Sequence, residues 1–183
     1  LKLLYCHFRR TAILNMTIKE HNKTKLWIIE SLFQLIEHKD YNNITISQIV
    51  DKAGLARRTF YRYFKTKNQV IEYTVKLLMQ DFASTILKNH SQTQKTIISS
   101  YFEFWSNHFD ILEALNKAHL SYFIEDNLLT LMYEVAIEVG HAPKEIDAEK
   151  RIEIYEKYKF DFTFKLSGLW KVTILWISES PRK

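Results

Sequence analysis

Residues 44–67 read ITISQIVDKAGLARRTFYRYFKTK, and this stretch predicts two short helices joined by a tight turn. Thr45 and Gln48 have the spacing of a capping box, so the first helix should begin directly after Thr45. Apolar residues then recur at helical spacing, which indicates one buried face. Gly54 is the residue type that most readily takes the positive φ found just past a helix end. We therefore expect the chain to turn at Gly54.

The second helix should run over residues 57–64. Phe60 and Phe64 are four residues apart and therefore share one face of it, which we expect to be buried. The polar side chains alternate with them and point away from that face. They are Arg57, Arg58, Tyr61 and Arg62. A second capping-box pair, Thr66 and Gln69, predicts that a third helix begins at residue 67.

A buried helix, a glycine turn and a short helix with a free polar face are typical of a helix-turn-helix motif. The planar guanidinium of arginine can donate two hydrogen bonds to O6 and N7 of guanine. Tyrosine hydroxyls and helix N-termini suit phosphates. The motif therefore favours DNA binding, and the alternative is that the arginines only form a solvated face.

Residues 23–78 resemble the DNA-binding domain of TetR-type (tetracycline-repressor-like) regulators. The matching segments are IIESLFQLIE, ITISQIVDKAGL, RRTFYRYF and the lysine two positions after Lys65. The resemblance implies that the short arginine-bearing helix enters the major groove and that ligand binding in a second, variable domain releases DNA. Ala56 departs from the pattern, because the family usually has a serine there. The missing cap should cost about 0.5–2 kcal/mol of local helix stability.

The resemblance also implies roles for single residues. The residues expected to read bases are Arg57, Arg58, Thr59, Arg62 and Ser47. The residues expected to bind phosphates are Tyr61, Tyr63 and Lys67. For Tyr63, packing of the ring is an equally open interpretation. Lys67 would be reinforced by the positive end of the helix that it begins.

The net charge of +5 is unevenly distributed. Residues 17–79, the predicted DNA-binding domain, carry eleven basic and six acidic side chains, whereas residues 80–183 carry twelve basic and fifteen acidic ones. A polyanionic partner therefore suits the first region only. Residues 1–16 form an N-terminal extension with three basic and no acidic side chains. That segment is either an extension before a start at Met16 or a basic arm that follows DNA.

Glycine and proline are scarce, with 3 and 2 residues, which argues against a turn-rich all-β fold. We expect an all-α protein, in which a long helix joins the three-helix DNA-binding domain to a helical ligand-binding and dimerisation domain at residues 80–183. A first helix is predicted over residues 23–39, in which Trp27 is interpreted as a packing residue. The predicted helices after the helix-turn-helix motif cover residues 67–88, 93–106, 109–118, 122–139 and 155–178. The charged segment before the last of these is read as a connection.

The last predicted helix is apolar on more than one face, so it is either central to its own domain or buried by a second chain. It resembles the dimerising helix of TetR-type proteins, and its Ser167–Gly168 step would allow close approach of another helix. A further dimer helix normally follows in that family, whereas this sequence ends at Lys183. Either the chain is cut short or the dimer uses fewer helices.

Aromatic residues interleaved with polar ones in residues 101–123 would suit a small apolar or aromatic effector, and the alternative is an ordinary aromatic core. The sequence has no phosphate-cradling glycine loop, nucleophile elbow or metal-ligand spacing, so we predict neither an enzyme nor a cofactor or metal. The one cysteine excludes an internal disulfide and favours a reducing compartment. No apolar run reaches the length of a membrane span, and we expect a cytoplasmic protein.

These observations predict a homodimeric transcription regulator that binds a palindromic double-stranded DNA operator, most simply a repressor released by a ligand. One alternative is a TetR-like adaptor or co-activator whose second domain binds a protein. Another is an enzyme with an incidental helix-turn-helix motif, for which a cleft with clustered ionisable side chains would be required.

Overall fold

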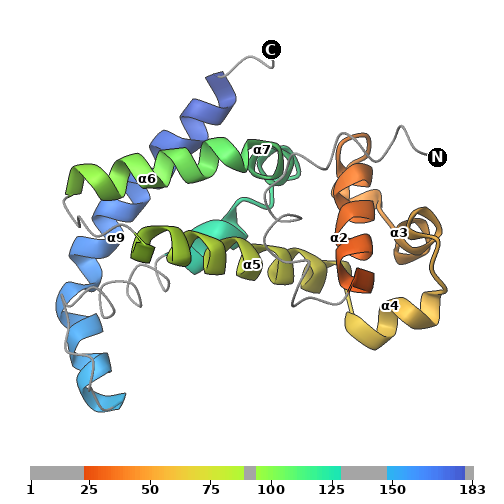
Figure 1. Cartoon of the computed structure of the whole chain (residues 1–183), viewed down its shortest axis with the longest axis horizontal. Helices are drawn as coiled ribbons and strands as arrows, with labels where there is room; N and C mark the ends of the chain where they lie inside the picture. The colour runs from red at the N-terminus through yellow and green to blue at the C-terminus, as the bar shows by residue number, and fades with distance from the viewer. Residues whose placement is uncertain (1–22, 89–93, 129–147, 180–183) are drawn as a thin grey trace. The chain divides into compact units, whose positions relative to one another are not determined.

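The computed structural model describes residues 23–88, 94–128 and 148–179, and these ranges are helical without a strand (Figure 1). The fold class predicted from the sequence is therefore confirmed. The helices are α2 (Lys23–Ile36), η3 (Tyr41–Asn43), α3 (Ile46–Ala53), α4 (Arg57–Tyr63), α5 (Lys67–Lys88), α6 (Gln94–Asn107), α7 (Phe109–Lys117) and α9 (Ala148–Glu179). A further helical segment covers residues 122–128.

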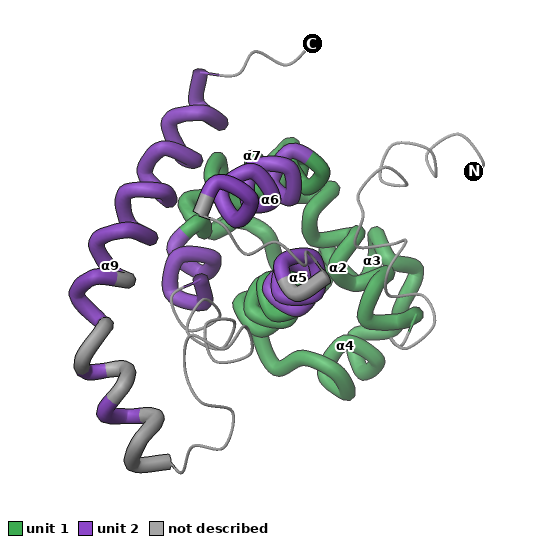
Figure 2. Tube along the Cα trace, turned by 60° about the vertical axis from the view of Figure 1, so that its left-hand side comes forward, with its two compact units in different colours: residues 1–78, 107–121 green, residues 79–106, 122–183 purple. Residues whose placement is uncertain are grey.

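The chain divides into two compact units, which Figure 2 shows in different colours. Unit 1 comprises residues 1–78 and 107–121, and unit 2 comprises residues 79–106 and 122–183. Helix α5 begins in unit 1 and ends in unit 2, so it is continuous between them. The predicted boundary between a DNA-binding domain ending at residue 79 and a ligand-binding and dimerisation domain beginning at residue 80 stays a prediction.

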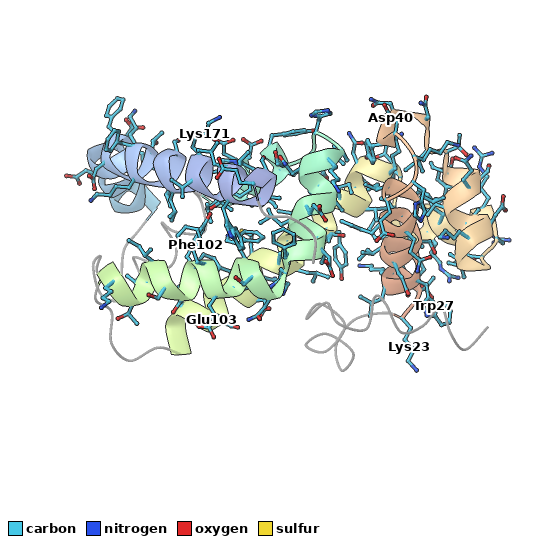
Figure 3. All side chains as sticks on the ribbon, turned by 90° about the horizontal axis from the view of Figure 1, so that it is seen from above. Lys23, Trp27, Asp40, Phe102, Glu103 and Lys171 are labelled. Carbon is cyan, nitrogen blue, oxygen red and sulfur yellow. The ribbon has the colours of Figure 1, made fainter. Side chains whose placement is uncertain are left out.

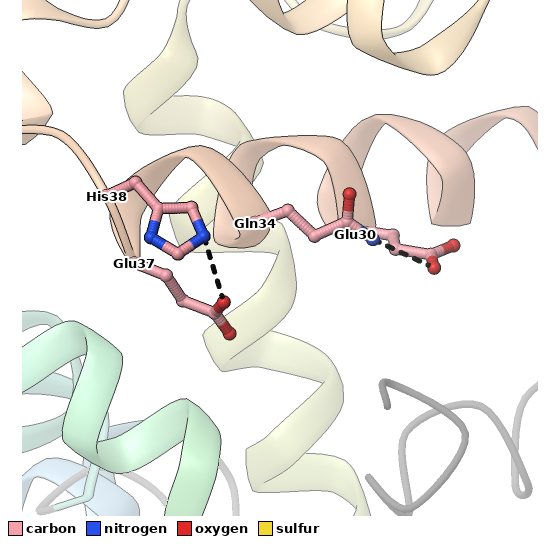
Figure 4. Close-up of polar contacts among 4 residues, drawn as sticks. All are labelled: Glu30, Gln34, Glu37 and His38. Atoms are coloured by element: carbon pink, nitrogen blue, oxygen red, sulfur yellow. Dashed lines mark hydrogen bonds and ion pairs between the residues drawn. The ribbon is translucent and has the colours of Figure 1, made fainter. Parts of the chain in front are cut away.

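The core of unit 1 is built on α2, which packs against α3 and α7, while α3 packs against α4. Its largest fully buried side chains are those of Phe33, Phe60, Ile28, Leu32, Ile49, Ile71, Leu78 and Ile111. The opposite face of α2 is polar, and on it Gln34 donates a hydrogen bond to Glu30. In the turn directly after α2, His38 lies 3.9 Å from the Glu37 carboxylate (Figure 4). One face of α2 is thus held by apolar burial and the other faces water.

Unit 2 has an aromatic core. The Tyr101 ring meets Phe82 and Trp105 edge to face, and Trp105 meets Trp170 of α9 in the same way. Such pairs add to the stabilisation that burial alone provides. Phe102, labelled in Figure 3, contacts the Trp176 ring edge to face at a centroid distance of 6.1 Å. Helices α6 and α9 are therefore joined by rings along their shared side.

Helix α9 is apolar on two opposite sides, as the sequence predicts. The buried side follows helical spacing and comprises Leu166, Trp170, Thr173 and Ile177. At 3.6 residues per turn, the opposite side carries Phe160, Phe164, Gly168 and Leu175. The side chains of Phe160 and Phe164 are 78% and 82% exposed. We call these four residues the outer face of α9.

Two predicted helix boundaries are wrong. Helix α2 ends at Ile36 rather than near Lys39, because the residues after it are polar and offer nothing to the core. Helix α9 begins at Ala148, so much of the charged segment read as a connection is helical. Its Glu, Lys and Ala residues favour helix without an apolar stripe. The end of the helix predicted over residues 122–139 lies outside the described residues.

Trp27, interpreted from the sequence as a packing residue, lies outside the core of unit 1. Its side chain is 45% exposed near the start of α2 (Figure 3). Leu26 and Ile28 on either side of it are buried, and a helix cannot turn three successive side chains to one face. The helical period therefore places Trp27 at the edge of the buried face.

Candidate nucleic-acid interface

Helix α3 has the ends that the sequence predicts. Thr45 and Gln48 form a complete capping box, in which each side chain accepts a hydrogen bond from the other residue's backbone N–H. At the other end, Gly54 adopts φ 66°, and the next N–H, that of Leu55, donates to the Val50 carbonyl at 2.9 Å. This is the bonding of a Schellman motif, which fixes the direction in which the chain leaves α3.

Helix α4 lies on its scaffold through two phenylalanines. Phe60 is fully buried and Phe64 nearly so, as predicted. The Phe64 ring also meets Tyr73 of α5 edge to face at 5.7 Å. Ala56 occupies the N-cap position and offers no side-chain hydrogen bond, so the predicted loss of a cap is confirmed. The helix therefore depends on packing rather than on capping.

The exposed face of α4 is basic. Arg57, Arg58 and Arg62 are all exposed, and none forms an ion pair with a carboxylate in the described part of the chain. Nη2 of Arg57 donates a hydrogen bond to the Tyr61 hydroxyl at 3.2 Å, and the guanidinium carbon lies 5.6 Å from that ring's centroid. These three arginines thus retain donors for an external acceptor.

Arg62 and Tyr63 form a second pair of the same kind. The Arg62 guanidinium donates to the Tyr63 hydroxyl at 3.2 Å and lies 4.9 Å from its ring centroid. Stacking of a guanidinium on an aromatic face contributes about 0.5–1 kcal/mol at exposed sites. Such contacts reduce the conformational freedom of the arginine before any ligand arrives.

Two further residues are predicted to read bases, Ser47 and Thr59, and two are predicted to bind phosphates, Tyr61 and Tyr63. Ser47 is exposed near the start of α3, and Thr59 is half-buried on α4. Tyr61 is 46% exposed, whereas Tyr63 is half-buried. Their assignment to bases and phosphates stays a prediction.

Lys67, which is predicted to bind phosphate, contacts the protein's own backbone in this structure, and its phosphate role stays a prediction. Its ammonium donates hydrogen bonds to the backbone carbonyls of Tyr41, Asn42 and Ile44 at 2.5, 3.2 and 3.0 Å. Burial lowers the pKa of Lys67, and the nearby Asp40 carboxylate partly offsets this. An ammonium has three N–H groups, so these carbonyls match its full donor capacity.

The contacts of Lys67 are the part of this region that sequence reasoning missed. They join the start of α5 to the connector at residues 40–45, more than twenty positions earlier in the chain. The available signal was electrostatic: a lysine in the first turn of a helix faces the positive end of the helix dipole, so it requires a compensating acceptor.

No group of acidic, histidine or cysteine side chains suited to a metal ion occurs among the described residues. None of the described helices is long and apolar enough to cross a membrane.

The fold is shared with a solved regulator. The crystal structure of a tetR-family transcriptional regulator from Streptomyces coelicolor superposes with a TM-score of 0.51 and 17% sequence identity, covering 85% of this chain and 72% of that one. At this identity the likeness establishes the fold alone.

Two proteins of Bacillus subtilis (strain 168) are similar in sequence. The HTH-type transcriptional regulator YxbF is 22% identical over 149 residues, which is 77% of this chain and 38% of that protein. The HTH-type transcriptional regulator YvdT is 43% identical over 44 residues, or 24% of this chain and 23% of that protein. The chain thus spans less than two fifths of the length of either relative.

The family assignment depends on the region built around α3 and α4. Residues 28–74 match the model of the family described as bacterial regulatory proteins, tetR family, and this stretch contains the capping box, the glycine turn and the arginine-bearing helix. The resemblance predicted from the residues is therefore confirmed. Residues 28–74 are therefore similar to the DNA-binding region of the tetR family of bacterial regulatory proteins.

Proposed function

We propose that this protein is a sequence-specific DNA-binding transcription regulator that reads base edges with the exposed face of α4. The observation that carries the proposal is the placement of Arg57, Arg58 and Arg62 on one short exposed helix, without an ionic partner among the described residues. Arginine donors held in this way suit guanine O6 and N7 in the major groove. Thr59 and Ser47 would reach the edge of the same groove.

Phosphates of the operator would be held by Tyr61 and Tyr63, whose hydroxyls lie at the border of the arginine face. Phosphate contacts supply affinity and register, whereas base contacts supply sequence preference. Mutations of the tyrosines and mutations of the arginines should therefore affect DNA binding in different ways. Loss of a tyrosine hydroxyl should weaken binding to all sequences, and loss of an arginine should also relax the preferred sequence.

The test begins with selection of bound sequences from random duplex DNA. With the selected site, Arg57→Ala or Arg58→Ala should lower affinity by about 1–3 kcal/mol and broaden the preferred sequence. Lys95→Ala is the matched control, because it removes one exposed positive charge from α6, outside both α4 and the outer face of α9. If the arginine variants keep wild-type affinity and footprints, α4 is not the reading helix.

A homodimer joined through the outer face of α9 would present two copies of α4 to one duplex. The exposed phenylalanines of this face are larger and more apolar than water-facing positions usually are. Gly168 leaves open space beside the helix, which would let a second helix approach closely. A two-fold dimer should place its reading helices about 34–36 Å apart, or a multiple of that, on a palindromic operator.

Regulation by a small molecule is the remaining part of the proposal. The aromatic cluster of unit 2, with the Tyr101 hydroxyl inside it, is the described region that suits an apolar or aromatic effector. The protein would then act in the cytoplasm as a repressor released by that compound. DNA binding measured with and without a cell metabolite extract tests this, and release by the small-molecule fraction is the expected result.

The second candidate is an adaptor or co-activator, which the exposed phenylalanines of α9 also favour. A protein partner, rather than a second copy, would then cover the outer face of that helix. The mass of the purified protein separates the two functions: a dimer supports the repressor, and a monomer at micromolar concentration favours the adaptor.

A further inference from the structure

The connector before α3 is held by the first two residues of α5. Three backbone carbonyls of this connector, those of Tyr41, Asn42 and Ile44, converge on the Lys67 ammonium. The Tyr41 hydroxyl also donates to the Asn68 side-chain oxygen at 2.6 Å. The connector is therefore bonded to α5 at both its backbone and its one buried tyrosine.

The position of this contact matters because α3 begins immediately after it. Ile44 is buried, and its carbonyl is the last acceptor of Lys67. Thr45, the next residue, is the N-cap of α3. Holding the Ile44 carbonyl thus fixes the backbone at the point from which α3, and then the glycine turn and α4, continue.

Electrostatics alone would disfavour a lysine here. Lys67 is the first residue of α5, where the helix dipole is positive and no acidic side chain occupies the first turn. The Tyr41 ring lies under the ammonium at 4.3 Å, so it supplies a further electronegative surface. The carbonyls and the ring together provide the compensation that the helix end does not.

We propose that Lys67 is a positioning residue for DNA recognition, which sets the pose of α3 and α4 by binding the carbonyls of the connector. It acts from within the protein and leaves the phosphates to other groups. This inference rests on the proposed function for its consequence at DNA, whereas the anchor itself can be tested on the free protein.

The free protein should reveal the anchor through hydrogen exchange. The backbone N–H groups of Asn43 and Ile44 are bonded within the connector, to Asp40 and Tyr41, so they report its opening. Lys67→Met keeps most of the apolar stem and removes the three donors. We expect on the order of tenfold faster exchange at these amides in Lys67→Met. Lys65→Met is the matched control, because it removes an exposed lysine two residues away and should leave exchange unchanged.

Lys67→Arg distinguishes the hydrogen bonds of the lysine ammonium from the effect of its positive charge alone. A planar guanidinium keeps the positive charge but cannot direct three donors to one convergent set of carbonyls. We expect Lys67→Arg to show the same fast exchange as Lys67→Met. If both variants exchange at the wild-type rate, Lys67 does not hold the connector in place.

The DNA measurement compares affinity for the selected operator with affinity for a scrambled duplex, at a temperature where every variant is folded. A positioning role predicts that Lys67→Met and Lys67→Arg both lower the ratio of these affinities, while the dependence of log K on log salt keeps its slope. A phosphate contact predicts instead an unchanged ratio, a slope smaller by about 0.9, and rescue by arginine. That result would overturn the proposal, and so would a ratio and a slope that both stay at the wild-type values.

The two proposals can fail separately. If the wild-type protein selects no DNA sequence, the proposed function fails, and the exchange measurement still decides whether Lys67 anchors the connector. If the wild-type protein selects an operator and the Lys67 variants retain its full specificity ratio, only the positioning role fails.

Discussion

The exposed faces of α4 and α9 are both unusual, and they differ in the chemistry that they leave open. On α4, arginines lie beside tyrosines that hold their guanidinium groups. On α9, phenylalanines stand in water with no polar group to satisfy. Exposed, held cations suit a polyanion, and exposed aromatic area suits another protein surface. The kind of partner that an exposed face can bind therefore depends on the chemistry of its side chains, and not on their exposure alone.

The two faces also differ in what supports them. Helix α4 is short and has no capping side chain at its N-terminus. Its pose therefore depends on the turn at Gly54 and on two buried phenylalanines. Helix α9 is 32 residues long and is held by its own buried side. Changes in the scaffold should therefore affect α4 more than α9, whereas changes in surface chemistry should affect each face directly.

The largest effect is expected on the outer face of α9. Phe164→Glu places a charge where the proposed dimer would bury a ring, and the two-fold axis repeats the change. Each copy should lose about 2 kcal/mol or more of association free energy. Analytical ultracentrifugation should show a shift from dimer to monomer, with operator affinity falling in parallel.

Thr163→Glu is the matched control for that change, because it adds the same charge at an exposed polar position one residue away. It should leave the dimer intact. If Phe164→Glu sediments as the wild-type protein does, the outer face of α9 is not part of the dimer interface.

The next effect tests the scaffold of α4. Gly54 and His119 end their helices with the same backbone bonds and similar positive φ values, 66° and 57°. Gly54→Ala should destabilise the protein by about 1–2 kcal/mol, because a Cβ is disfavoured in this conformation. His119→Gly should stabilise it, since it removes the same strain after α7. Thermal unfolding measures both.

The paired signs make this test specific. If Gly54→Ala and His119→Gly both destabilise, side-chain contacts rather than backbone strain govern these helix ends. In the expected case, only Gly54→Ala should also lower operator affinity, because only that turn leads into α4.

A smaller effect concerns the buried side of α9. The Tyr101 hydroxyl lies 2.8 Å from Thr173 Oγ1, and the threonine hydroxyl donates to the Leu169 carbonyl. The tyrosine is therefore the donor of the pair. Tyr101→Phe should cost about 0.5–1.5 kcal/mol of unfolding free energy, through the loss of one hydrogen bond.

The same residue gives a pH dependence. Burial raises the pKa of Tyr101 to about 12. A folded-state pKa above the unfolded value means that this stabilisation is complete below about pH 10 and is lost as pH rises toward 12. Burial also raises the pKa of Tyr73, so absorbance at the phenolate band should show a late-titrating step that becomes smaller, but does not vanish, in Tyr101→Phe. A late step of unchanged amplitude in this variant would contradict the assignment.

The contrast between the two faces also separates what the sequence could predict from what it could not. The ends of α3 were predictable, because a capping box and a glycine turn involve residues only a few positions apart. The start of α9 was not, since a charged helix without an apolar stripe resembles a linker. The Lys67 contacts were missed because they join residues distant in the chain, and distance in sequence hides such pairs.

The smallest effect is expected at the N-terminus of α4, where a capping side chain can be added. Ala56→Ser supplies an N-cap acceptor for the N–H groups of the first turn, where the alanine offers none. The gain should be about 0.5 kcal/mol, at the low end for capping, because the helix end is exposed. The cap lies outside the arginine face, so we expect higher thermal stability with an unchanged operator sequence. Ala56→Val, which adds bulk without an acceptor, should give no such gain. If Ala56→Ser instead changes which bases are preferred, the pose of α4 depends on its first turn, and packing of Phe60 and Phe64 is not sufficient to fix the reading face.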